Sequence, residues 1–158
     1  MTREELVGRG LAQQIVALGF SDKYITGPPV FRVSGGEGRD YEDILDCVDI
    51  IGSYNSFKPK KVKAALSALD TFRYRISIGR ESSPVIYIGA ICLDPEEFRE
   101  FKEKNGSIPA ADLKLYTDRM KEFENFNRAC EKFAKATKAT EFSFRVESVY
   151  RACRFWWD

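Results

Sequence analysis

Hydrophobic and polar residues alternate most strictly over Phe72–Ile78, in the sequence FRYRISI. A period of two predicts a strand with its aromatic and aliphatic side chains on one face and Arg73 and Arg75 on the other. Gly79–Pro84 is rich in turn-forming residues, and the run that follows, Val85–Leu93, is apolar on both faces. Such a run is typical of a central strand covered on both sides. These segments therefore predict an antiparallel hairpin at the centre of a sheet.

Three further segments show weaker strand patterns. Val30–Val33 follows two prolines, so it is expected at the edge of the sheet, where a missing N–H is tolerated. Glu141–Glu147 alternates again, with its three apolar side chains facing the core and Arg145 facing outward. The last segment, Val149–Trp157, fits a strand or a helix.

Helical periodicity and end signals predict the remaining elements. The clearest start is Asp94, an N-cap residue that is followed by proline and two glutamates. Asn105 and Gly106 then end that helix. The other expected helices cover residues 2–19, 40–51 with Asp40 as the cap, 57–69, and 109–137.

The helix near 110–137 carries an amphipathic apolar stripe that begins at Leu113. Its 28 residues would span about 42 Å, which is longer than a small domain is wide. The helix is therefore either broken or projects at one end to meet a partner. Asn127 lies in the stripe, where a polar residue can fix the register of a coiled coil. The stripe fits intramolecular core, with a homodimer through the long helix as the alternative.

Together these elements predict an α+β fold. We expect an antiparallel sheet of about three to five strands with helices packed on it. The length of 158 residues fits a single domain over 1–158. The order of helices and strands favours segregated layers over a parallel sheet.

Charge adds one feature to this picture. The net charge is only +1, yet residues 58–92 contain seven basic and two acidic residues. Four lysines crowd the start of the helix that Pro59 opens, which is the end where the helix dipole disfavours positive charge. They are Lys58, Lys60, Lys61 and Lys63. The lysines either face acidic residues upstream or bind an anion or a partner.

The helix before them carries an acidic side, formed by Glu42, Asp43, Asp46 and Asp49. Residues three or four apart are neighbours on a helix, so these carboxylates would form a ridge. A ridge of this kind fits a solvated face or a surface for a basic partner. A third hypothesis is a metal-dependent carboxylate enzyme that uses Asp43 or Asp46, although ligands on an outward ridge converge poorly on Mg²⁺.

Cysteine and histidine usage limits the chemistry. The four cysteines are too far apart for a CxxC metal or redox motif, and the chain contains no histidine. We expect free, buried thiols in a reducing compartment, which is the cytoplasm, and no metal or cofactor. The N-terminal residues contain no apolar signal segment, and no apolar run approaches the roughly 17 residues that span a bilayer. No membrane partner is expected.

One segment resembles a known family. The sequence Val85–Ile91, followed by the helix start at Asp94, resembles the first signature strand and the next helix of an RNA-recognition motif. The second signature strand is replaced by a long helix, and Phe142–Val146 lacks its glycine. The resemblance covers about seventeen residues, and no family is assigned from it.

With no catalytic motif present, the sequence favours a non-enzymatic protein that binds another protein, as an inhibitor or adaptor. The alternative is a nucleic-acid-binding domain that uses Arg73, Arg75 and Arg145 with the lysine cluster. Adjacent tryptophans at 156 and 157 either dock on the core or offer aromatic rings to a partner. The candidate partner-binding residues are Lys58, Lys60, Lys61, Lys63, Arg73, Arg75, Arg145, Trp156 and Trp157.

Overall fold

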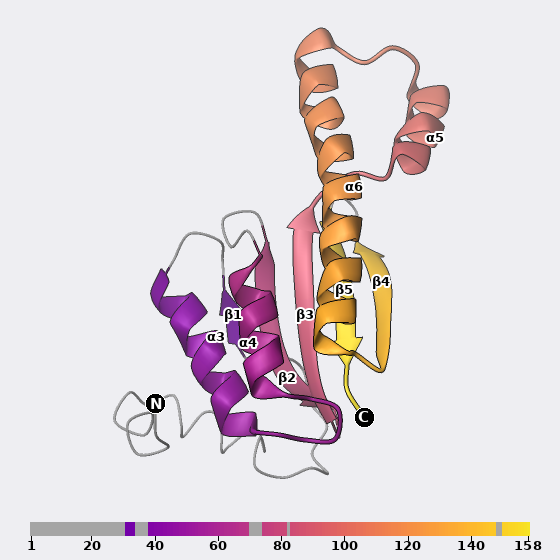
Figure 1. Ribbon diagram of the computed structural model, residues 1–158. Coiled ribbons are helices and arrows are strands. Elements are labelled where there is room, and N and C mark those ends of the chain that lie inside the picture. Colours follow the sequence, from indigo (N-terminus) through magenta and orange to yellow (C-terminus); the bar gives the residue numbers. More distant parts are fainter. Residues whose placement is uncertain (1–30, 34–37, 70–73, 82, 148–149) are drawn as a thin grey trace.

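A computed structural model gives the structure of the chain, and the residues described are 31–33, 38–69, 74–81, 83–147 and 150–158. The helix predicted over residues 2–19 lies outside these ranges, and so does Arg73. Helices and strands follow the chain in an order that Figure 1 shows. Their bounds are β1 (Phe31–Val33), α3 (Gly38–Ile51), α4 (Pro59–Ser67), β2 (Arg75–Glu81), β3 (Ser83–Ile91), α5 (Pro95–Asn105), α6 (Ala110–Thr137), β4 (Glu141–Glu147) and β5 (Tyr150–Trp156).

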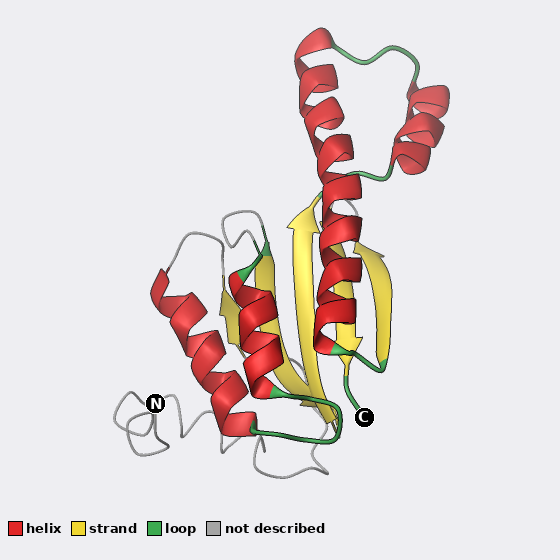
Figure 2. Ribbon diagram, viewed as in Figure 1, coloured by secondary structure: helices red, strands yellow, loops and turns green. Residues whose placement is uncertain are grey.

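The strands in the described ranges form one five-stranded sheet in the order β1-β2-β3-β5-β4. Every neighbouring pair is antiparallel. The predicted α+β class is confirmed, with β3 at the centre and β1 at one edge as expected. Helices α3, α4 and α6 cover one face of this sheet (Figure 2).

The central hairpin has a shorter turn than the sequence predicted. The β2–β3 pairing continues through Gly79↔Val85 and Arg80↔Pro84 to Glu81↔Ser83. Gly79–Pro84 is therefore mostly strand, and the prediction that it forms the turn is wrong. The physical reason is that glycine and proline weaken a strand without forbidding it: proline is tolerated near a strand's first residues.

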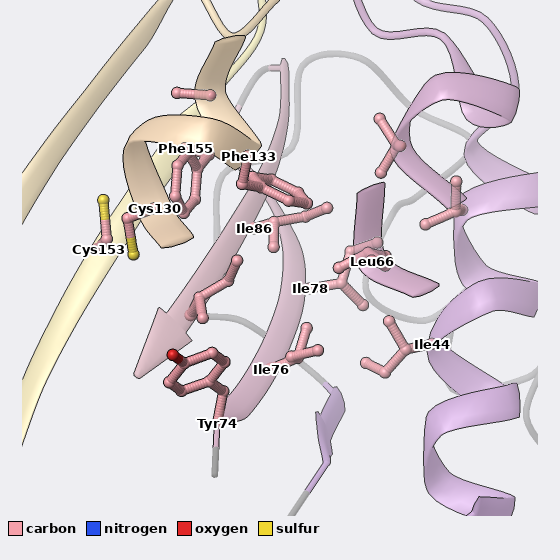
Figure 3. Close-up of a cluster of buried hydrophobic side chains, with 14 of the residues drawn as sticks. Ile44, Leu66, Tyr74, Ile76, Ile78, Ile86, Cys130, Phe133, Cys153 and Phe155 are labelled. Atoms are coloured by element: carbon pink, nitrogen blue, oxygen red, sulfur yellow. The ribbon is translucent and has the colours of Figure 1, made fainter. Parts of the chain in front are cut away.

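The core lies between the sheet and the three helices (Figure 3). Alternate residues of the central strands point into it, including Ile76 and Ile78 of β2 and Ile86 of β3, all fully buried. They meet Ile44 of α3 and Leu66 of α4. The core face predicted from the alternation in β2 is confirmed.

Strand β3 is apolar and buried on both faces along most of its length, as the sequence predicted. Val85 and Ile86 point to opposite faces and are both fully buried. Ile91 is the exception, since it is the last residue of β3 and remains 52% exposed. The expectation that the whole run to Leu93 is core is wrong at this end.

The chain after β4 also forms a strand, which settles the ambiguity at residues 149–157. β5 lies between β3 and β4 and pairs with both along its whole length. This leaves β4 as an edge strand. Phe142 of β4 is 43% exposed for that reason, but its ring stacks on that of buried Phe155 at 6.1 Å, so it lies on the core side of the sheet as predicted.

The helix ends predicted from the sequence match those of α5, but the predicted start of α3 does not match the observed one. Asp94 caps α5, and its Oδ1 accepts a hydrogen bond from the backbone N of Glu96 at 2.9 Å. Helix α3 begins at Gly38, two residues before the predicted cap at Asp40. It ends before Gly52, whose positive φ of 69° suits glycine.

Helix α6 is continuous, and its first half projects beyond the sheet together with α5 (Figure 1). The backbone N of Leu93 donates to the carbonyl of Arg119 at 3.1 Å, where the chain leaves the sheet. Residues 110–118 of α6 thus extend about 13 Å beyond this contact. The predicted projection is confirmed, and we call α5 with residues 106–118 the α5–α6 arm.

Helix α5 packs on α6 through aromatic rings. The ring of Phe98 lies 5.3 Å from that of Tyr116, and the ring of Phe101 lies 6.5 Å from it. Further along α6, Phe126, Cys130 and Thr137 are fully buried in the core. The apolar stripe of α6 therefore divides into a core half and an arm half.

Candidate functional site

The lysine cluster lies on α4, and its members have different environments. Lys63 donates to Asp49 Oδ2 of α3 at 2.7 Å, so for this residue the ion-pair interpretation is confirmed. Lys58, Lys60 and Lys61 are exposed. The first turn of α4 contains no acidic residue, and Lys58 caps the helix without a side-chain hydrogen bond.

The acidic residues of α3 do not form one exposed ridge. Asp46 is only 8% exposed, although the sequence placed it on the outer side of the helix. Glu42 is exposed and Asp49 pairs with Lys63. Within the described ranges, no group of three or more acidic, cysteine or histidine side chains could hold a metal ion.

The arginines lie on the sheet face opposite the helices. Residues Arg75, Gly89, Ala152 and Arg145 are successive partners in one row across β2, β3, β5 and β4. Arg75 and Arg145 are exposed at the two ends of this row, with two small residues between them. The expectation that these two arginines share a face is confirmed.

This arrangement separates the arginines from the lysine cluster. The lysines lie on α4, whose buried residues Val62 and Leu66 pack on the other face of the sheet. The two groups therefore do not form one basic patch, and the prediction that they lie near each other is wrong. A strand pattern reveals which residues share a face but not which face a helix covers.

Aromatic side chains accompany the arginines on this face of the sheet, opposite α3, α4 and α6. Tyr87 pairs with Arg154 in the row next to Arg75 and Arg145. The guanidinium of Arg154 lies 5.9 Å from the ring of Trp156 and 3.9 Å from Glu141 Oε2. The sequence did not identify Arg154 as a candidate because residues 149–157 had no assigned conformation, and it did not identify Tyr87 because Val85–Leu93 was expected to be core.

The two tryptophans point to opposite faces of β5 and the chain that follows it. Trp157 is fully buried, with its ring 5.1 Å from that of Phe57, and its Nε1 donates to the carbonyl of Thr137 at 3.0 Å. Its interpretation as a docked core residue is confirmed, and it is not a partner-binding residue. Trp156 is half-buried on the sheet face opposite α3, α4 and α6.

Arg151 of β5 forms a polar contact inside the helix-covered face. Its guanidinium lies between the rings of Phe123 and Phe144, at 4.6 and 4.2 Å from their centroids. Its Nε donates to Asn127 Oδ1 at 3.0 Å. Asn127 therefore makes an intramolecular contact, which fits the interpretation of the stripe as core.

All four cysteines are buried free thiols. Burial raises the pKa of the Cys92 thiol to about 11, and the nearby Arg151 guanidinium opposes that rise. Burial, together with a hydrogen bond involving Cys153, also raises the pKa of the Cys130 thiol. The raised pKa values leave little thiolate at neutral pH, so the Cys92 and Cys130 thiols are poor nucleophiles.

The α5–α6 arm exposes large apolar side chains. Phe101 is 47% exposed, Leu113 41% and Leu115 47%. Leu113 precedes Tyr116 by three residues and so lies beside it on α6, and the ring of Tyr116 lies 6.5 Å from that of Phe101. We call Phe101, Leu113 and Tyr116 the arm patch.

In the described part of the chain, no helix is both long and apolar enough to cross a membrane. Comparisons with protein-family profiles, with curated proteins and with solved structures find no match for this chain.

Proposed function

We propose that this chain is a non-enzymatic protein that binds another protein, as an inhibitor or adaptor, and that the α5–α6 arm is its docking element. The observation that carries the proposal is the exposed arm patch on a helical hairpin that extends beyond the sheet (Figure 1). Exposed apolar groups gathered on one projecting element favour burial in an interface. Aromatic residues such as Phe101 and Tyr116 are also enriched at interfaces.

The experiment compares proteins captured from a lysate by three forms of the chain. The arm variant carries Phe101→Ser and Leu113→Ser, which are nearly half exposed and should leave the fold intact. The control variant carries Phe142→Ser, a phenylalanine of similar exposure on β4. The wild type and the control should capture similar amounts of a partner. The arm variant should capture at least tenfold less. Equal capture by all three forms would contradict the proposal.

A second copy of the chain is one partner that this arm could take. Light scattering at increasing protein concentration detects a homodimer directly. If the arm mediates it, the dimer should dissociate in the arm variant and persist in the Phe142→Ser control. A concentration-independent monomer in the wild type would remove self-association and leave a different protein as the partner.

Nucleic-acid binding on the sheet face opposite α3, α4 and α6 is a second candidate function. The specific observation that favours it is the row that ends in Arg75 and Arg145, with Tyr87 in the next row of this face and Trp156 one row further. Aromatic rings on a sheet can stack bases while arginines contact phosphates. Filter binding to single-stranded RNA and DNA at about 50 and 200 mM salt tests it. Each arginine-to-alanine change should lower the salt slope by about 1.

We also propose that the chain works in a reducing compartment, the cytoplasm. Four buried free thiols, none held in a disulfide, support this location. Fluorescence microscopy of the tagged full chain tests it.

A further inference from the structure

A cleft lies between α4 and α6, on the side of the protein that carries the lysine cluster. Its volume is about 280 Å³. Alanines dominate its lining, and each contributes a single methyl group where a larger side chain would fill the space between the helices. The lining residues are Ala65, Ala68, Leu69, Tyr74, Ala129, Lys132, Phe133 and Ala136.

Positive charge surrounds this apolar cleft. Residues 58–69 and 127–138, which contain α4 and the end of α6, hold eight basic residues and one acidic residue. Lys63 and Arg128 are paired with Asp49 and Glu124. The other lysines of these two segments are exposed, namely Lys58, Lys60, Lys61, Lys132, Lys135 and Lys138.

Two of these lysines lie at the cleft itself. Lys132 is one of its lining residues, on α6. Lys61 precedes Ala65 by four residues on α4, so it lies one helical turn from the lining. An apolar cleft with ammonium groups at its margin is complementary to a molecule that has an apolar chain and a negative head group. The head group would remain near the surface, so no charge would have to be buried.

We propose that this cleft binds a single-chain amphiphile with an anionic head group, specifically a medium-chain carboxylate. The alkyl chain occupies the space between the alanines of α4 and α6 and displaces water from their methyl groups. The carboxylate pairs with the ammonium of Lys132, which supplies three donors on a flexible stem. A volume of 280 Å³ is at the lower end for ligand pockets, which favours one short chain over a bulky ligand.

The proposal is independent of the α5–α6 arm, so its test is separate from that of the proposed function. The probe is decanoate, kept below the concentration at which it forms micelles, and binding is measured by calorimetry and by NMR. One decanoate should bind per chain, with nuclear Overhauser contacts from its methylenes to the methyl groups of Ala129 and Ala136. Affinity should rise about fourfold per methylene from hexanoate to decanoate.

Variants test the tail and the head group separately. Ala129→Leu places a larger side chain in the cleft at a helical position that favours leucine, and it should weaken decanoate binding at least tenfold. Ala65→Leu tests the same point from α4 should the first variant fold poorly. Lys132→Gln should weaken binding severalfold, whereas Lys135→Gln, an exposed lysine outside the lining, should change it less than twofold.

Four results would overturn the proposal. Decanoate could fail to saturate the wild type, or it could bind both leucine variants as tightly as the wild type. Decyltrimethylammonium, which has the same chain and the opposite charge, could bind as tightly as decanoate. The arm variant with Phe101→Ser and Leu113→Ser must retain full decanoate binding, and a loss there would place the ligand on the arm instead.

Discussion

Replacing Trp157 tests most directly whether the last residues belong to the core. The side chain is fully buried and contacts the aromatic rings of Phe57, Phe133 and Phe155, with centroids 5.1 to 6.5 Å apart. Its indole N–H donates to the carbonyl of Thr137, near the end of α6. The residue therefore joins α6 to the segment before α4 and to β5.

The expected cost follows from these contacts. Trp157→Ala leaves a large cavity, and changes of this kind cost about 3–5 kcal/mol of the free energy of unfolding. Trp157→Phe keeps an aromatic ring but leaves the Thr137 carbonyl without this donor in a buried position, which costs about 1–3 kcal/mol. A domain of ordinary stability has about 5–15 kcal/mol in total, so Trp157→Phe is the variant more certain to remain folded.

Trp156 provides the matched control, because it is the adjacent residue and lies half-buried on the other face of β5. Urea unfolding of Trp157→Phe and Trp156→Phe should be followed by far-ultraviolet circular dichroism, since tryptophan fluorescence changes with either substitution. We expect the Trp156→Phe change to cost about 0.5 kcal/mol or less. Equal costs for the two variants would refute the assignment of Trp157 to the core.

Three further predictions concern individual interactions. A double-mutant cycle on Lys63 and Asp49 should give a coupling of about 1 kcal/mol or less, because both side chains are about one-third exposed and salt screens such pairs; larger values would contradict this. Asp94→Ala should cost about 1 kcal/mol in urea unfolding through loss of the α5 cap, with Asp94→Asn nearly neutral. Burial raises the pKa of the Cys92 thiol from 9.0 to about 11, so the unfolded chain loses this proton first as pH rises. The stability that the neutral thiol contributes is present below pH 9 and should fall by about 2 kcal/mol by pH 11, a fall that Cys92→Ala should lack.

Local sequence patterns predicted the strands and helices well because each signal depends on neighbouring residues. The alternation from Tyr74 to Ile78 and the cap at Asp94 act within a few positions and correspond to the observed elements. The turn in the hairpin was placed wrongly because Gly79 and Pro84 are residue types that favour turns. In the structure both residues are paired within β2 and β3. Here tertiary pairing outweighed local propensity.

The cleft between α4 and α6 depends on contacts between elements that are distant in the sequence, and periodicity does not reveal such contacts. The cleft joins Ala65 of α4 to Ala129 of α6, and no local pattern distinguishes these alanines from others on a helix. Arg151 and Asn127 are another example, because their hydrogen bond joins β5 to α6. The sequence left core and self-association both open at Asn127, since a polar residue in an apolar stripe has the same appearance in either role.

The positions of the charged groups also determine which hypotheses can hold together. The lysines of α4 and the arginines at 75 and 145 lie on opposite sides of the sheet, separated by the core. A single nucleic-acid strand that contacts the arginine row would therefore not reach the lysines without passing around an edge of the sheet. Nucleic-acid binding should consequently depend on Arg75 and Arg145 but not on Lys60 or Lys61. Binding that requires both groups equally would favour long-range attraction by net charge over a defined site on either face.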